Sequence, residues 1–352
     1  MKSIIRKKTV AALIFVIGAA AVICGGFYIW NQAMRTKDAR KLQECGWQYA
    51  MTDAGYALSY RKIGSDTAEH IVIPLADAGA DDMAETIEPM AACLENGTLF
   101  LCMDRAGYGL SSDTQIPQTI EQVVADYRSA LKDAHIEPPY ILLPHSYGGM
   151  IAAYWESLYP DEIEGVFFLD TFGNGAFGET SAAQVTWMQR FGAKFGIPRF
   201  DRRITDALPP DYSAVQKTNA ARLALHSFGT YAKASEAALM QENCQTAYEA
   251  IVTNDIPKTY INAASFRTAD DWLRADDWAR TFRRMPELSD AERSEAADRA
   301  VEACRTNTES QVKPFTEQLG NCEYMELSGD HYIYMQKPAK CAVLFSRFLM
   351  RL

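Results

Sequence analysis

The chain has 352 residues, of which 48% are hydrophobic, so it can form one large domain with an insertion, or two domains. Residues 1–41 carry eight basic side chains and one acidic side chain, whereas the rest of the chain carries 27 basic and 44 acidic ones, a net charge of −17. This acidic body excludes the basic footprint that a nucleic-acid-binding protein needs.

The N-terminal segment is an uncharged stretch, 9–30, that follows the basic residues 1–8. A helix of this length can cross a bilayer of about 30 Å. We predict a basic cytoplasmic tail at 1–8, a transmembrane anchor at 9–30 and a linker at 31–45. Because a short basic tail usually stays inside, the body is expected outside the cytoplasm. A cleaved signal peptide and a buried helix of a soluble protein are the alternatives.

Beyond residue 45, apolar runs of strand length alternate with segments of helical periodicity. The predicted strands are 46–51, 56–64, 70–76, 98–104, 139–144, 165–170, 258–265 and 322–329. The predicted helices include 81–96, 117–134, 150–159 and 337–352, and charged helices are expected up to about 314. Because the strands are apolar throughout, we expect an α/β fold with a mostly parallel sheet and helices on both faces.

The stretch 171–254 interrupts this alternation, because it has helical patterns and no clear strand. It predicts a helical cap inserted between the two parts of the core, 46–170 and 255–352. The cap contains several aromatic residues, which either line an apolar pocket or pack within the cap; packing is the better explanation. They are Trp187, Phe191, Phe195, Phe200 and Tyr212.

A serine stands at the corner between a predicted strand and a predicted helix, in the run ILLPHSYGGMIA at 141–152. Ligands of a parallel sheet bind beyond the carboxyl ends of its strands, where Ser146 falls. The corner must be sharp, and Gly148 and Gly149 supply the small neighbours that it needs. At the start of the following helix, the backbone N–H of Tyr147 can stabilise an oxyanion. Ser146 is therefore the candidate nucleophile.

A serine nucleophile needs a histidine base. The chain has five histidines: His70, His135, His145, His226 and His331. His331, in SGDHYIY, is the one that follows a strand at the carboxyl edge of the sheet. His145 precedes the serine on its strand and is expected to point away into the fold. His331 is the predicted base by position and by elimination.

Three motifs make the chain resemble the α/β-hydrolase fold superfamily: LLPHSYGGMIAAYWESLYPDEIEGVFFLD, DRAGYGLSS at 104–112 and GDHYIYMQKP. The resemblance covers roughly 46–352 and is weakest over the cap. It implies a Ser-His-acid triad. In some members the acid directly follows the strand after the nucleophile, and Asp170, 24 residues after Ser146, fits that place. Most members place it after the strand predicted at 258–265, where Asp270 and Asp271 are the alternatives.

The sequence departs from the family pattern at two places. Pro144 stands where a glycine usually precedes the nucleophile by two residues. PLADAG stands where the family often has His-Gly, so the second oxyanion donor is expected from the backbone N–H groups near Ala76 and Asp77. A carboxylate at Asp77 opposes a developing oxyanion unless the side chain turns away.

These patterns together predict a membrane-anchored serine hydrolase acting on a small-molecule ester or related acyl substrate through an acyl-enzyme. A peptide hydrolase of aminopeptidase type is the alternative within the same mechanism. No metal or organic cofactor is implied, and the expected partners are the substrate and the membrane. Two rival hypotheses are a catalytically silent ligand-binding protein of this fold, and a membrane-tethered recruiting module that exposes a large apolar patch on the cap.

Overall fold

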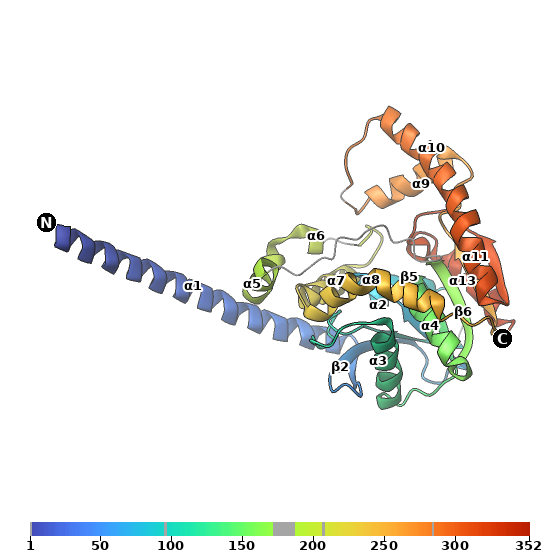
Figure 1. Cartoon of the computed structure of the whole chain (residues 1–352), viewed down its shortest axis with the longest axis horizontal. Helices are drawn as coiled ribbons and strands as arrows, with labels where there is room; N and C mark the ends of the chain where they lie inside the picture. The colour runs from blue at the N-terminus through green and yellow to red at the C-terminus, as the bar shows by residue number, and fades with distance from the viewer. Residues whose placement is uncertain (1, 95–96, 172–186, 206–207, 284) are drawn as a thin grey trace.

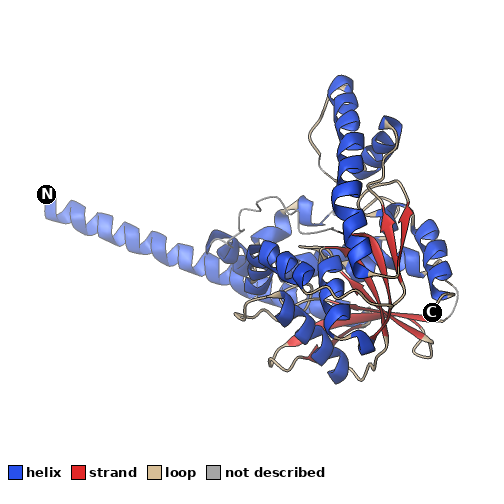
Figure 2. Cartoon of the chain, turned by 45° about the vertical axis from the view of Figure 1, so that its right-hand side comes forward, coloured by secondary structure: helices blue, strands red, loops and turns tan. Residues whose placement is uncertain are grey.

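The centre of the molecule is an eight-stranded sheet with strand order β1-β2-β4-β3-β5-β6-β7-β8 (Figure 2). The computed structural model describes residues 2–94, 97–171, 187–205, 208–283 and 285–352. At one edge, β1 pairs antiparallel with β2, and β2 pairs antiparallel with β4. All the remaining neighbouring pairs, from β4–β3 to β7–β8, are parallel. The strands are β1 (Trp47–Met51), β2 (Ala57–Gly64), β3 (His70–Leu75), β4 (Thr98–Met103), β5 (Tyr140–Ser146), β6 (Ile163–Thr171), β7 (Lys258–Asn262) and β8 (Cys322–Glu326). The predicted mostly parallel sheet is thus confirmed.

Helices cover both faces of the sheet because its central strands are apolar on both sides. Every residue of β4 and β5 is buried, and alternate residues of β5 belong to two different hydrophobic clusters. One cluster includes side chains of α3 (Ile120–Asp133) and α4 (Gly148–Leu158), and the other those of α2 (Met83–Ala91) and α13 (Pro338–Leu349). The core therefore consists of two apolar layers, one on each side of the strands that lead to the candidate site.

The cap lies between β6 and β7 and is helical, as expected, although its first part, 172–186, lies outside the described residues. Its elements are α5 (Trp187–Phe195), η2 (Ile197–Phe200), α6 (Arg202–Thr205), α7 (Ala214–Ser227) and α8 (Tyr231–Glu249). A second helical excursion separates β7 from β8 and projects from the body in Figure 1. It comprises α9 (Ala269–Arg280), α10 (Asp290–Asn307), η3 (Thr308–Val312) and α11 (Lys313–Leu319). The short η1 (Pro160–Glu162) and α12 (Ile333–Gln336) complete the fold.

The N-terminal helix α1 (Lys2–Glu44) runs continuously from the chain start to the body (Figure 1). From Ala12 onward it is long and apolar enough to cross a membrane, judged by length and composition. The segment expected to be a linker, 31–45, is helical up to Glu44, and it is packed rather than free. Asn31 donates hydrogen bonds to the carbonyls of Ala193 and Lys194 at 2.8 and 3.1 Å, and Leu42 is fully buried. The helix continues because tertiary partners hold its second half in place.

Candidate active site

Ser146 occupies a sharp corner at the end of β5. Its φ is 54°, in the left-handed region that a non-glycine residue rarely adopts, and its side chain is buried. A Cβ on Gly148 would lie 2.2 Å from the Leu75 carbonyl oxygen, and a Cβ on Gly149 would lie 2.4 Å from the Cβ of Thr171. Both glycines are therefore required by close packing behind the corner. Pro144 is accommodated within β5, opposite Leu75 of β3, so the proline does not prevent the bend.

The carboxylate of Asp170 faces the imidazole of His331. One oxygen, Oδ2, lies 2.7 Å from His331 Nδ1, and the other, Oδ1, accepts hydrogen bonds from the backbone N–H groups of Ala263 and Ala264 at 2.7 and 3.2 Å. Asp170 also has a positive φ of 47° at the end of β6, directly beside the corner, where Ser146 pairs with Thr171. The topology thus brings together two residues that lie 161 positions apart in the chain.

The two alternative acids lie elsewhere, at the start of α9. The side chain of Asp271 forms a reciprocal capping box with Thr268 and a salt bridge with Arg274 at 2.6 Å. Asp270 is exposed in the first turn of the same helix. Carboxylates in the first turn complement the helix dipole, so both have a structural explanation that needs no catalytic role.

The surroundings of His331 favour its protonated form. Burial acts to lower its pKa, but the hydrogen bond and charge of Asp170, with the nearby charges of Asp77 and Asp330, raise the pKa of His331 above its usual value. A carboxylate on Nδ1–H is the partner that holds the ring with its other nitrogen available to accept a proton. The imidazole is thus prepared to become an imidazolium.

His145 contacts this histidine instead of pointing away from the site, so that expectation was wrong. Its side chain is fully buried, and the two rings are 4.5 Å apart between centroids. Burial and the neighbouring charge of His331 lower the pKa of His145 to about 4, so the ring is neutral near pH 7. Its Nε2 lies 3.0 Å from the His331 carbonyl oxygen, which can only accept, so Nε2–H is the donor. His145 therefore holds the backbone of the loop that carries the predicted base.

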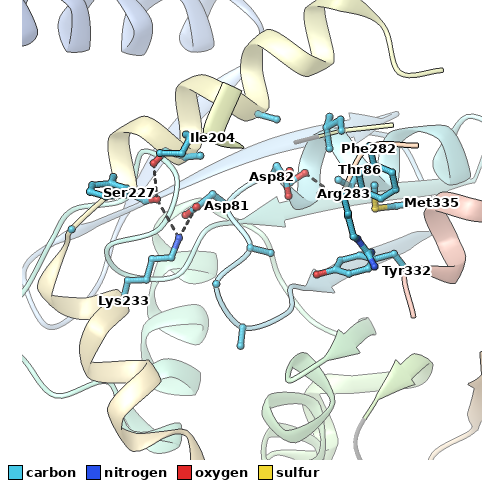
Figure 3. Close-up of a pocket in the computed structure, with 18 of the residues that line it drawn as sticks. Asp81, Asp82, Thr86, Ile204, Ser227, Lys233, Phe282, Arg283, Tyr332 and Met335 are labelled. Carbon is cyan, nitrogen blue, oxygen red and sulfur yellow. Dashed lines mark hydrogen bonds and ion pairs between the residues drawn. The ribbon is translucent and has the colours of Figure 1, made fainter. Parts of the chain in front are cut away.

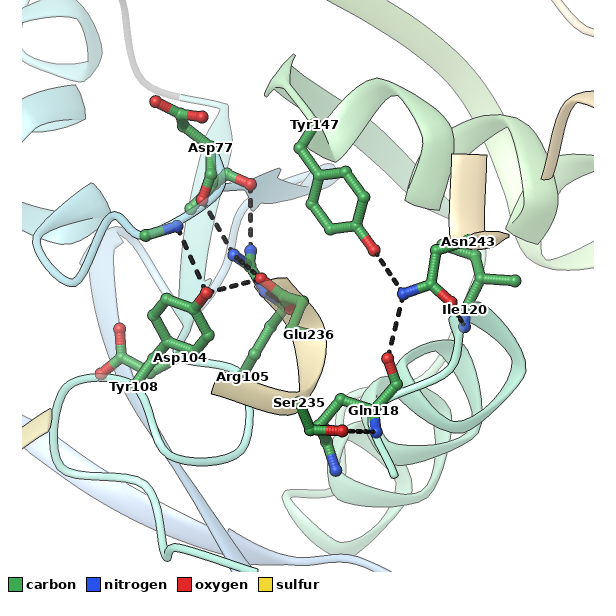
Figure 4. Close-up of polar contacts among 12 residues, drawn as sticks. Asp77, Asp104, Arg105, Tyr108, Gln118, Ile120, Tyr147, Ser235, Glu236 and Asn243 are labelled. Carbon is green, nitrogen blue, oxygen red and sulfur yellow. Dashed lines mark hydrogen bonds and ion pairs between the residues drawn. The ribbon is translucent and has the colours of Figure 1, made fainter. Parts of the chain in front are cut away.

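The loop after β3, predicted to supply the second oxyanion donor, is fixed by Arg105. Its guanidinium donates hydrogen bonds to the carbonyls of Ala76 and Asp77 at 2.9 and 2.8 Å (Figure 4). It also forms a nearly fully buried salt bridge of 2.6 Å with Glu236 of α8, which accepts a further hydrogen bond from Tyr108. Buried charges must be paired in this way, since an unpaired one costs several kcal/mol. The network ties the cap to the loop after β3.

Sequence reasoning missed this network. Arg105 and Tyr108 lie within DRAGYGLSS, so the motif itself offered a signal for them. Glu236 lies in a long helical stretch of the cap and gave no such signal. Only the packing of α8 against the β3 and β4 loops reveals that it matters.

The side chain of Asp77 is directed away from Arg105 (Figure 4) and accepts a hydrogen bond from Tyr332 at 2.5 Å. Asp77, His145 and His331 offer ligand atoms within 4.8 Å of one another, the set in the described part of the chain that could hold a metal ion. As it stands, the arrangement places a carboxylate near the predicted base.

A cavity of about 580 Å³ lies under the cap (Figure 3). Its wall combines apolar side chains of the cap with residues from the second excursion and from the loop of the predicted base. They include Ile204, Leu208, Phe228, Phe282, Tyr332 and Met335. Tyr332, the residue directly after His331, lines the cavity, whereas Ser146, His331 and Asp170 are not among its lining residues. None of the five aromatic cap residues considered above lines this cavity, so the pocket alternative, the less favoured of the two explanations, does not hold for it.

Two charged pairs border the cavity. Lys233 of α8 bonds to Asp81 at 2.6 Å, and Arg283 bonds to Asp330 at 3.1 Å while its guanidinium lies over the ring of Tyr332. The cavity is thus mainly apolar, with a few charged groups at its edge, which is typical of a site for a small organic ligand.

Known proteins match both the fold and part of the sequence. A family model described as alpha/beta hydrolase fold matches residues 78–234, which include Ser146 and Asp170. The structure of an enol-lactonase from Burkholderia xenovorans LB400 has a TM-score of 0.53 at 17% identity, covering 86% of this chain and all of that one. The structure of a bromoperoxidase from Bacillus anthracis has a TM-score of 0.56 at 16% identity, with 87% and 100% coverage. At such identities these likenesses show the fold alone.

A sequence relative is the uncharacterised protein YqjL of Bacillus subtilis strain 168, which is 34% identical over 94 residues. The match covers 27% of this chain and 37% of that protein, so it spans little more than a third of the relative. The structural likenesses, the family model and the motifs agree that the chain has the α/β-hydrolase fold.

Proposed function

We propose that this protein is a membrane-anchored serine hydrolase that cleaves carboxylic esters through Ser146, His331 and Asp170. The observation that carries the proposal is the 2.7 Å contact between Asp170 and His331, formed beside a serine at a strained strand–helix corner. Fold alone does not define activity, since proteins with other named activities share this architecture. The combination of nucleophile, base and acid supports hydrolysis at an acyl carbon.

In this mechanism the hydroxyl of Ser146 attacks the ester carbonyl carbon, and Nε2 of His331 accepts the hydroxyl proton. The negative charge on the carbonyl oxygen is stabilised by the N–H of Tyr147 and by N–H groups of the Ala76–Asp77 loop. His331 then gives the proton to the leaving alkoxide, which departs as an alcohol. Water, deprotonated by the same imidazole, attacks the acyl-serine and releases the carboxylic acid.

The proposed organisation assigns residues 46–170 and 255–352 to the catalytic core and 171–254 to the cap. Residues 9–30 of α1 serve as the anchor, and the basic residues 1–8 stay in the cytoplasm, so the core lies outside it. What supports the anchor is that α1 is apolar, long, and exposed along 12–18. A soluble protein would leave these side chains in water at a large cost in free energy.

One observation favours peptides with a free N-terminus as a second substrate class. Asp82 lines the cavity, and burial, together with the neighbouring charge of Asp81, raises its pKa to about 6. Above that pH its carboxylate is ionised and can pair with an ammonium group in a poorly solvated place. Asp82→Asn should weaken turnover of aminoacyl substrates and leave uncharged esters unaffected.

The test uses the full chain in detergent or nanodiscs, because the second half of α1 is packed on the body. The native protein, Ser146→Ala and a heat-denatured sample are treated with a fluorescent fluorophosphonate. We expect labelling of the native protein alone, followed by turnover in a panel of nitrophenyl esters and aminoacyl nitroanilides. A folded native sample that takes no label contradicts the proposal and favours the silent ligand-binding alternative.

A further inference from the structure

Two cap elements, η2 and α7, contact the N-terminal helix through polar side chains. Arg199 of η2 bonds to Asp38 at 2.7 Å and to Asn31 at 2.9 Å, and both partners on α1 are almost fully buried. On the next cap helix, His226 lies 3.1 Å from the carbonyl oxygen of Arg35. These contacts fix where the cap lies along the axis of α1, so the depth of α1 in a membrane would also set the depth of the cap.

The segment 187–200, comprising α5 and η2, exposes large apolar side chains. The exposed side chains are Trp187, Met188, Phe191, Ile197 and Phe200, and the exposed fractions of Trp187 and Phe200 are 73% and 71%. Five large exposed apolar side chains thus lie within 14 positions, and we call them the apolar patch of the cap; soluble proteins rarely leave so much apolar surface in water. Apolar packing within the cap therefore does not explain them.

This patch is continuous with the aromatic end of the apolar helix. The ring of Phe200 stacks on Trp30 at 6.0 Å, and Phe195 meets Tyr28 at 6.3 Å. Figures 1 and 2 both show this part of the cap beside α1 where the helix reaches the body. The 22 residues 9–30 span about 33 Å as a helix, close to a hydrocarbon thickness of about 30 Å. The patch thus lies at the level where the bilayer ends.

The charge of the segment also differs from that of the body. Residues 187–200 contain three basic side chains, Arg190, Lys194 and Arg199, and no acidic one. Arg199 is paired with Asp38, and Lys194 is exposed. The chain beyond residue 41 has a net charge of −17. Aromatic and apolar side chains combined with basic ones are typical of segments that lie in the headgroup region of a membrane.

We propose that the segment 187–200 of the cap is embedded in the headgroup interface of the bilayer that α1 crosses, with Trp187, Phe191 and Phe200 inserted among the lipids. The inference rests on the proposed anchor and extends it: the enzyme is held to the membrane by its cap as well as by its helix. The cavity wall includes Gln189, which lies in this segment, and Ile204 of the following helix α6. The cap face at the bilayer is therefore also part of the boundary of the proposed substrate site.

The experiment measures contact between Trp187 and lipid directly. The full chain is reconstituted in vesicles of mixed zwitterionic and anionic lipids, with acyl chains either plain or brominated near the headgroup, since bromine quenches tryptophan on contact. The fluorescence emission of Trp187 is obtained by subtracting the emission of the Trp187→Phe variant from that of the native protein. We expect brominated lipid to lower this difference by about twofold or more, as for an interfacial residue.

A matched control is Trp272→Phe in α9, which lies on the excursion far from α1 in Figures 1 and 2. The emission of Trp272, obtained as the native emission minus that of Trp272→Phe, should be the same in both lipids. The emission of Trp30, obtained in the same way from Trp30→Phe, should fall in brominated lipid. An unquenched Trp187 beside a quenched Trp30 overturns the proposal. So does protection of Trp187 that depends on protein concentration, because a second copy then covers the patch.

The outcome is independent of the proposed function, because quenching needs no turnover. Fluorophosphonate labelling of Ser146 in the same vesicles reports on the hydrolase separately. A labelled protein with an unquenched Trp187 refutes only the interfacial cap, and an unlabelled protein with a quenched Trp187 refutes only the hydrolase.

Discussion

Replacing Asp170 by asparagine tests the proposed triad most sharply. The positive φ at this position suits asparagine at least as well as aspartate, so the backbone should keep its conformation. The Ala263 and Ala264 N–H groups both point at Oδ1, and only an oxygen can accept from them. The asparagine must therefore keep its oxygen there and turn its NH₂ group toward His331.

That orientation forces His331 into the wrong tautomer. Facing an NH₂ donor, Nδ1 must accept, so the ring proton moves to Nε2, the nitrogen that has to take the proton of Ser146. The equivalent change in a serine protease triad lowers kcat by about 10⁴-fold, which corresponds to about 5.4 kcal/mol of lost transition-state stabilisation. We expect a loss of this order in kcat and little change in KM, since Asp170 does not contact substrate.

The assay is the steady-state hydrolysis of a short nitrophenyl ester by the full chain, with Asp270→Asn as the matched control. The control should retain native activity, because that side chain is exposed at the start of α9. Circular dichroism and thermal unfolding establish that Asp170→Asn is folded. An Asp170→Asn enzyme within tenfold of native activity would refute the assignment and return the role to Asp270 or Asp271.

Three further predictions concern the pH profile, the corner and the buried network. In the native enzyme kcat/KM should rise with pH as His331 loses its proton, with a midpoint above the usual histidine value of about 6.5, because Asp170 raises the pKa of His331; a midpoint below about 6 in a pH–rate profile would contradict this. Gly149→Ala should abolish most fluorophosphonate labelling and lower the Tm, because the alanine Cβ would lie 2.4 Å from the Cβ of Thr171. An unchanged Tm and unchanged labelling would show that the corner accommodates a Cβ at this position. Glu236→Gln should lower the free energy of unfolding by about 3 kcal/mol by leaving the buried Arg105 without its counter-charge, whereas the exposed Glu242→Gln on the same helix should change it by less than about 0.5 kcal/mol in urea titrations.

The sequence by itself determined the order of the elements and two of the proposed catalytic positions. Apolar runs of strand length, alternating with helical periodicity, specify a buried parallel sheet, because such strands must bury both faces. The corner at Ser146 and the strand end before His331 follow from the same alternation, since parallel strands bring their carboxyl ends to one edge. These are local signals, and local signals can be read along a chain.

Tertiary structure decided what depends on distant partners. The sequence favoured Asp170 over Asp270 and Asp271 by its place in the chain, but only the structure shows that Asp170 faces His331 and that Asp271 caps its own helix. Glu236 gave no signal because its role depends on the approach of α8 to Arg105. Packing within the cap was expected for Trp187, Phe191 and Phe200, and only the structure shows that they are exposed beside Trp30. Side-chain identity gives the chemistry that is available, and packing determines which partner each group meets.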